Sequence, residues 1–143
     1  LVGGQAARLA GASHGGLAAF HTACAFPEQF HLAGCLSPSF WVGRGRHGGD
    51  IRSTLRGSAL MQLVDATLKD QEKRPVLWID WGLRADGARF GAREMADLLV
   101  TDYGYRDGQD ARFLEDQNGG HDELAWGWRL RLLLETFYGE NGF

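Results

Sequence analysis

The sequence predicts an α/β fold in which helices cover both faces of a mostly parallel sheet. Short apolar runs of strand length alternate with longer segments whose apolar residues recur every three or four positions, which is the pattern of βα units. The 143 residues are 44% hydrophobic and 23% charged, as in one globular unit with a sizeable core. No internal repeat or low-complexity linker divides the chain, so we expect residues 1–143 to form a single domain.

The first half of the chain predicts two strands with a helix between them. Residues 8–10 form a short strand that ends at a glycine. Leu17, Phe20 and Cys24 then recur at helical spacing, which indicates a helix with one apolar face. Residues 31–36 predict the next buried strand. We therefore expect the first two strands to be parallel and joined by this helix.

A loop over residues 37–50 leads to a predicted helix over residues 50–70. Asp50 is placed as the N-cap of this helix, because a short acidic side chain can accept a hydrogen bond from the first free backbone N–H groups. The apolar residues of the segment recur at helical spacing. Its expected core positions are Ile51, Leu55, Leu60, Leu63, Val64 and Leu68.

The second half predicts two more strands and two more helices. Residues 75–80 are continuously apolar up to a final aspartate, as in a strand buried on both faces. A helix over residues 88–103, a strand over residues 111–115 and a closing helix over residues 122–137 follow. The expected core-covering residues of the last helix are Trp126 and Trp128.

Composition argues against several classes of function. The net charge of −3 comes from 15 basic and 18 acidic residues spread along the chain, so we expect no nucleic-acid partner. No apolar run has the length of a membrane span. Cys24 and Cys35 are expected to be small buried residues, and the histidines show no metal-ligand spacing, so we expect neither a metal nor another cofactor.

A serine stands between glycines where the first predicted strand meets the first helix. The segment "GASHG", residues 11–15, fits the pattern G-x-S-x-G in the strand–turn–helix context that this pattern requires. Such a turn strains the backbone of Ser13, needs glycines nearby and leaves the hydroxyl clear of the sheet. The backbone N–H of His14, at the positive end of the helix, can then stabilise an oxyanion. The motif predicts that Ser13 is a nucleophile, which in turn requires a base held by a third group.

Candidates for those two groups follow in the order Asp, then His. Four segments carry a wider pattern: "LAGASHGGLAAF", "FPEQFHLAGCLSPSFW", "VLWIDWGLRAD" and "NGGHDELAWGWRLRLLL". In these segments the chain resembles the esterase family of α/β-hydrolases that includes enterochelin esterases, feruloyl and acetyl-xylan esterases and the antigen 85 mycolyltransferases. The resemblance implies the α/β-hydrolase fold, a three-layer αβα arrangement. It also implies that Ser13 is the nucleophile, His121 the general base and Asp86 the acid, with Asp80 and Glu94 open as alternative acids.

Two aromatic residues are candidates for binding substrate. Phe40 and Trp41 follow the second strand, so they should lie near the carboxyl edge of the sheet, where open α/β folds bind ligands. They are expected to line an acyl or aromatic pocket, with ordinary packing as the alternative.

The strand at residues 8–10 would be central in a complete α/β-hydrolase sheet. The resemblance implies that preceding strands form the other half of that sheet and supply a second oxyanion N–H. We therefore expect this chain to be the C-terminal half of the fold, completed by an N-terminal half or by a partner chain at the otherwise unpaired edge.

Together these observations predict a serine hydrolase that cleaves a carboxylic ester of a small molecule or carbohydrate through an acyl-enzyme. Two alternatives remain. One is an acyltransferase of the same fold, and the other is a binding module that retains the serine turn without turnover.

Overall fold

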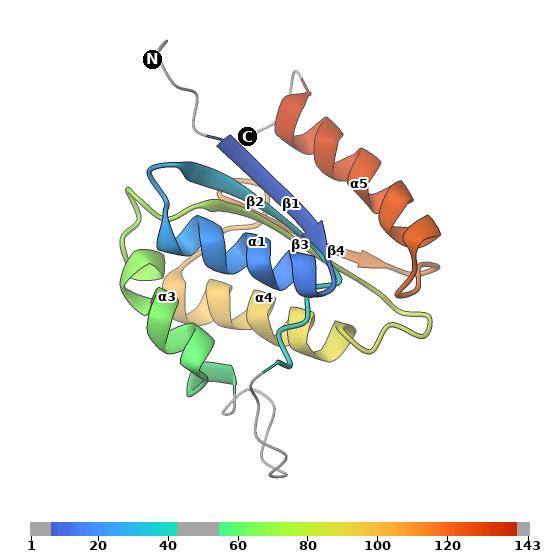
Figure 1. Cartoon of the computed structure of the whole chain (residues 1–143), viewed down its shortest axis with the longest axis horizontal. Helices are drawn as coiled ribbons and strands as arrows, with labels where there is room; N and C mark the ends of the chain where they lie inside the picture. Colours follow the sequence, from blue (N-terminus) through green and yellow to red (C-terminus); the bar gives the residue numbers. More distant parts are fainter. Residues whose placement is uncertain (1–6, 43–54, 140–143) are drawn as a thin grey trace.

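The computed structural model describes residues 7–42 and 55–139, and its centre is a four-stranded parallel sheet (Figure 1). The strands lie in sequence order across the sheet, so each new strand pairs with the one before it. They are β1 (Ala7–Ala12), β2 (Phe30–Leu36), β3 (Val76–Gly82) and β4 (Ala111–Asp116). The helices are α1 (His14–Ala25), α3 (Ala59–Lys69), α4 (Arg89–Tyr103) and α5 (Glu123–Tyr138). The predicted α/β fold is confirmed, and all four strands lie within two residues of their predicted ends.

The helix predicted over residues 50–70 is shorter than expected. Helix α3 begins at Ala59, and its N-cap is Ser58, whose hydroxyl accepts a hydrogen bond from the N–H of Met61 at 3.3 Å. A turn at Gly57 precedes it, as expected of a residue that weakens helices. The proposed N-cap Asp50 lies outside the described residues.

One predicted core position of this helix is wrong. Leu63 is 70% exposed, whereas Met61, Val64 and Leu68 of the same helix are buried. These three residues share one face at helical spacing, and Leu63 lies away from it. The hydrophobic type of Leu63 therefore misled the prediction, since single exposed leucines are common on protein surfaces.

Two separate apolar clusters cover the two faces of the sheet. The larger is built with α1, α3 and α4, and the smaller with α5. Side chains alternate along β3, as they must in a strand: Leu77 and Ile79 enter the larger cluster, whereas Trp78 enters the smaller. Asp80 continues the alternation, so its carboxylate lies buried on the face that α5 covers.

Helix α5 covers its face of the sheet only in part. Leu133 and Phe137 are buried, but Trp128 is 56% exposed, so the prediction that it covers the core is wrong. Trp126 is half-buried and packs against the smaller cluster, as predicted. Figure 1 shows β1 at one edge of the sheet, with α5 beside it and no described strand on its open side.

The remaining features of the fold agree with the sequence. Cys24 and Cys35 are buried, as expected, and the structure shows no disulfide between them. Among the helices of residues 7–42 and 55–139, none combines the length and apolar character needed to cross a bilayer.

Candidate active site

The turn after β1 holds Ser13 in a strained conformation. Its φ of 57° is in the left-handed region, which is unfavourable for a residue with a side chain. A Cβ on Gly11 would lie 2.4 Å from the carbonyl oxygen of Gly15, and one on Gly16 would lie 3.0 Å from the oxygen of Gly11. A Cβ on Gly15 would meet nothing within 4 Å. The close approach of strand and helix therefore requires Gly11 and crowds Gly16, whereas the second glycine of the motif leaves room for a side chain.

Three side chains from three different loops meet beside this turn. His121 Nε2 lies 3.0 Å from Ser13 Oγ, and His121 Nδ1 lies 2.9 Å from Asp86 Oδ1. The three residues follow β1, β3 and β4, and the carboxyl ends of parallel strands share one edge of a sheet. The structure thus brings together the three residues that the sequence singled out. They form a Ser–His–Asp hydrogen-bonded chain.

Asp86 is a buried carboxylate held by several donors. The backbone N–H groups of Gly82 and Ala88 donate to it at 2.8 and 2.9 Å, and the Ser37 hydroxyl donates at 2.6 Å. Burial by itself raises the pKa of Asp86, but the hydrogen bonds from Ser37, Gly82, His121 and Ala88 outweigh it and hold that pKa below its ordinary value. Asp86 therefore stays ionised at neutral pH and can accept the Nδ1 proton of His121.

The two alternative acids do not contact His121 in the structure. Asp80 is buried against Arg129, whose Nη1 lies 2.9 Å from Asp80 Oδ1. Burial raises the pKa of Asp80 to about 6, although Arg129 and a hydrogen bond from Trp78 act in the opposite direction. Glu94 lies within α4. Of the three carboxylates, Asp86 alone lies within hydrogen-bond distance of His121.

His121, the predicted base, lies on a tight loop between β4 and α5. Asp116, the last residue of β4, accepts hydrogen bonds from the N–H groups of Asn118 and Gly119 at 3.0 and 2.9 Å. The ring of Trp126 meets the ring of His121 edge-on, with centroids 5.0 Å apart. The His121 side chain keeps 29% of its surface exposed.

The surroundings of the Ser13 hydroxyl include the backbone N–H of His14, the predicted oxyanion donor, and a second serine. His14 is the first residue of α1, so its N–H has no acceptor within the helix. Ser39 Oγ lies 3.3 Å from Ser13 Oγ and 3.5 Å from His14 Nδ1. The sequence predicted no role for Ser37 or Ser39, which follow β2. Their position after a buried strand was the available signal.

The two aromatic candidates differ in their exposure. Phe40 is 1% exposed and packs edge-on against Phe20, with centroids 5.1 Å apart. The prediction that Phe40 lines a substrate pocket is therefore wrong, because its ring is part of the core. Trp41 is 50% exposed and meets the ring of His14 edge-on at 5.6 Å. Of the two rings, only that of Trp41 is exposed.

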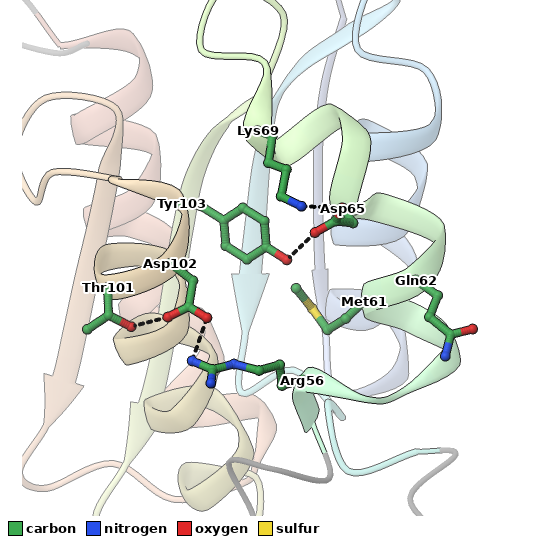
Figure 2. A pocket seen from close by; sticks show the side chains of 8 residues that line it. All are labelled: Arg56, Met61, Gln62, Asp65, Lys69, Thr101, Asp102 and Tyr103. Carbon is green, nitrogen blue, oxygen red and sulfur yellow. Dashed lines mark hydrogen bonds and ion pairs between the residues drawn. The ribbon is translucent and has the colours of Figure 1, made fainter.

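A concavity of about 600 Å³ lies between α3 and α4, and none of the site residues described above lines it (Figure 2). Its charged groups already satisfy one another: Arg56 pairs with Asp102, and Lys69 lies 2.7 Å from Asp65. The Tyr103 hydroxyl also donates to Asp65, at 3.0 Å. Its lining residues are Arg56, Met61, Gln62, Asp65, Lys69, Thr101, Asp102 and Tyr103. No cluster of three potential metal ligands occurs in the described part of the chain.

Comparisons with known proteins bear on this arrangement. Residues 3–135 match the family described as Putative esterase. The chain belongs to this family. No curated protein sequence matches the chain significantly.

Two solved structures share the fold of this family member. One is the crystal structure of enterochelin esterase from Shigella flexneri, with a TM-score of 0.66 and 20% identity over 92% of this chain. The other is the enterobactin esterase FES from Shigella flexneri, in the presence of 2,3-di-hydroxy-N-benzoyl-glycine, with a TM-score of 0.58 and 22% identity over 83% of this chain. This chain spans 30% and 28% of the lengths of those two chains. The sheet and helices therefore have the α/β-hydrolase arrangement.

Proposed function

We propose that this chain carries the catalytic serine, base and acid of a carboxylic ester hydrolase. The observation that supports the proposal best is the continuous hydrogen-bonded chain from Ser13 Oγ through His121 to Asp86. Membership of the esterase family supports the same reaction class. The distances of 3.0 and 2.9 Å are those at which a proton can pass from the hydroxyl to an oriented imidazole.

In the first half of the proposed reaction, Ser13 Oγ attacks the carbonyl carbon of the ester as its proton moves to His121 Nε2. The resulting oxyanion is stabilised by the His14 N–H and by the positive end of α1. Asp86 stabilises the imidazolium through Nδ1. Collapse of the tetrahedral intermediate breaks the bond to the alcohol, which leaves with the proton from His121 Nε2, and the acyl group remains on Ser13.

In the second half, His121 Nε2 removes a proton from water, which attacks the acyl carbonyl. The second tetrahedral intermediate expels Ser13 Oγ, which recovers its proton, and the carboxylic acid is released. An alcohol in place of water would make the same chain an acyltransferase. The exposed ring of Trp41 beside His14 supports an ester with an aromatic or other flat apolar group, of the kind named with one of the similar structures.

We also propose that the open edge of β1 receives a further strand of the same hydrolase fold, from polypeptide outside the described residues. A groove of about 430 Å³ runs between β1 and α5, and Trp126 Nε1 is buried without a described hydrogen-bond partner. The groove is lined by Ala10, Gly11, Ala12, Leu36, Glu123, Trp126, Gly127 and Leu130. The solved relatives are about three times as long as this chain, which supports extra strands as the occupant. Hydrogen exchange at the edge-facing amides of β1 should be fast in this chain and slow in a longer polypeptide that contains it; equal rates would contradict the proposal.

Two measurements on one set of variants test the reaction. The wild-type chain, Ser13→Ala, Asp86→Asn and Ser58→Ala are treated with a fluorophosphonate and, separately, with a p-nitrophenyl ester. Ser58 caps α3, away from Ser13, so its variant is the matched control for the loss of a serine hydroxyl. We expect an adduct on Ser13 in the wild type and in Ser58→Ala, none in Ser13→Ala, and labelling roughly 100-fold or more slower in Asp86→Asn.

The outcomes separate the alternatives. Absence of an adduct in the wild type would contradict an activated Ser13 and leave a binding module. An adduct without ester turnover would show an activated serine whose acyl acceptor, or second oxyanion donor, is not supplied by this chain.

A further inference from the structure

A fully buried arginine lies behind the site and contacts two of its neighbours, Ser37 beside Asp86 and Gly120 beside His121. Arg129, on the sheet-facing side of α5, is 0% exposed. Its Nη2 donates to the hydroxyl of Ser37 at 3.1 Å and to the carbonyl of Gly120 at 2.9 Å. Its Nη1 lies 2.9 Å from Asp80 Oδ1, and its Nε lies 3.8 Å from Asp116 Oδ2. A charge buried this deeply is tolerated only when it is paired and hydrogen-bonded, which makes the position of the guanidinium well defined.

The first contact reaches the acid. Ser37 has a single hydroxyl proton, and the hydroxyl accepts from Arg129, so the proton is free to point at Asp86 Oδ2, 2.6 Å away. Arg129 Nη1 itself lies 4.0 Å from the same oxygen. Ser37 is held in turn by its N–H, which donates to Asp80 Oδ1 at 3.0 Å. Oδ2 of the acid is thereby fixed from behind, whereas Oδ1 accepts the N–H of Ala88 and faces His121.

The second contact reaches the base. The carbonyl of Gly120 belongs to the peptide unit that leads directly into His121, so a donor on that oxygen fixes the orientation of the peptide. The same loop is pressed against β3, since a Cβ on Gly82 would lie 2.2 Å from the carbonyl oxygen of Gly119. Arg129 therefore holds a loop that has little room to move toward the sheet.

Asp80 explains why the guanidinium stays in place. Its Oδ1 faces Arg129, and its Oδ2 accepts the indole N–H of Trp78 at 2.8 Å. Both oxygens of the Asp80 carboxylate thus have partners, which fixes the side chain on a central strand. The Nη1 atom of Arg129 thus pairs with Asp80 on β3, and its Nη2 atom donates to Ser37 and Gly120, next to the acid and the base.

We propose that Arg129 is the positioning residue of the site: its buried guanidinium holds Asp86, through Ser37, and the His121 loop, through Gly120, at the separation that places Nδ1 on the acid and Nε2 on Ser13. The inference rests on the proposed function for its catalytic consequence, but not for its effect on the imidazole. A planar fork with several donors is required for this role, and lysine, which carries the same charge at a single point, does not provide one.

The test compares Arg129→Lys with Arg131→Lys, a matched control on the same helix whose exposed side chain pairs with Glu135 at 2.8 Å. Two quantities are measured: the rate of Ser13 labelling by a fluorophosphonate, and the tautomer of His121 from its ring ¹⁵N shifts. We expect the wild type and Arg131→Lys to carry the proton on Nδ1. Arg129→Lys should show a mixture of tautomers and labelling slower by roughly 10- to 100-fold, as for a misplaced base.

A second variant keeps the proposal testable if Arg129→Lys folds poorly. Ser37→Ala removes only the contact to the acid, and we expect it to slow labelling and shift the tautomer less than Arg129→Lys does. The double variant should be slowed by less than the product of the two single effects, because both act through one network, and a fully multiplicative loss would contradict that network.

The possible failures of the two proposals are distinct. If Arg129→Lys and Ser37→Ala keep the wild-type tautomer and labelling rate, the positioning role is overturned while the proposed function stands. If no variant is labelled but the tautomer shifts only in Arg129→Lys and Ser37→Ala, the positioning role stands and the proposed function fails.

Discussion

Helices cover the two faces of the sheet to different degrees. On one face, α1, α3 and α4 enclose a large cluster in which residues such as Leu77, Ile79 and Leu99 are fully buried. On the other face, α5 buries only a small cluster. Its exposed surface includes large apolar side chains, with Leu124 at 88% and Leu134 at 45% exposed.

The two faces therefore contribute differently, one mainly to stability and the other to the candidate site. The enclosed face supplies most of the apolar burial that stabilises the fold. The α5 face carries the polar network of Asp80 and Arg129 and supports His121 from behind. Its remaining apolar surface is consistent with the proposed docking of further strands at β1.

The largest expected difference between the faces is in stability. Leu99→Ala should lower the free energy of unfolding by about 2 to 5 kcal/mol, because it leaves a cavity in the enclosed cluster. Leu134→Ala should lower it by about 0.5 kcal/mol or less, because the side chain is already in water. Urea unfolding measures both values. An equally large loss in Leu134→Ala would mean that the α5 face is as closed as the other.

The next effect concerns pH and the α5 face. Burial raises the pKa of Asp80 from 3.8 to about 6, so the folded chain binds more protons than the unfolded chain between those pH values. Stability contributed by this group therefore falls as pH rises from 4 to 6, by about 3 kcal/mol. The pKa of Asp86 is shifted the other way, so its contribution is present above pH 3.8 and is lost as pH falls further.

The matched variants for this prediction are Asp80→Asn and Asp97→Asn, the latter on the exposed side of α4. Unfolding free energies are measured between pH 4 and 7. Asp80→Asn should lose the decline between pH 4 and 6, and Asp97→Asn should retain it. A decline of the same size in Asp80→Asn would assign the effect to another group.

Helix capping should not distinguish the faces. Ser58 caps α3 by accepting from the N–H of Met61, and Asp122 caps α5 by accepting from the N–H of Ala125 at 3.0 Å. Ser58→Ala and Asp122→Ala should each cost about 1 kcal/mol, because a cap satisfies local backbone groups irrespective of tertiary packing. Thermal unfolding of both variants checks this. A markedly larger loss in one would show that its side chain also contributes to packing.

The smallest expected effect of the exposed α5 surface is on self-association of the chain. Leu124→Ser with Leu134→Ser should change stability little but reduce self-association of the chain, as measured by sedimentation at increasing concentration. Leu63→Ser is the control, since Leu63 is an isolated exposed leucine on α3. If Leu63→Ser reduces association as much, the apolar surface of α5 has no special role.

The sequence predicted those parts of the site whose signals are local. The glycines around Ser13 identify the turn because backbone strain and crowding act over a few residues. His121 and Asp86 were assigned by the resemblance to the esterase family, and the readable apolar runs before them place their loops at the same edge of the sheet. The fold class was predictable for the same reason.

The errors arose where the outcome depends on distant neighbours. Phe40 follows a strand, but the ring of Phe20 from α1 draws it into the core. The burial of Arg129 was not predicted, because an arginine in a helix is usually exposed. Its burial depends on the alternation along β3, which directs Asp80 toward α5 across 49 positions of sequence.

The order of the strands has a consequence for synthesis of the chain. Ser13 and His121 lie 108 positions apart, and each strand pairs with the one made just before it. At translation rates of 5 to 20 residues per second, roughly 5 to 20 s separate the emergence of the two residues from the ribosome. During that time the strained turn can form on the nascent chain while its hydroxyl lacks a base. The proposed nucleophile, Ser13, is therefore made well before its proposed base, His121, is available.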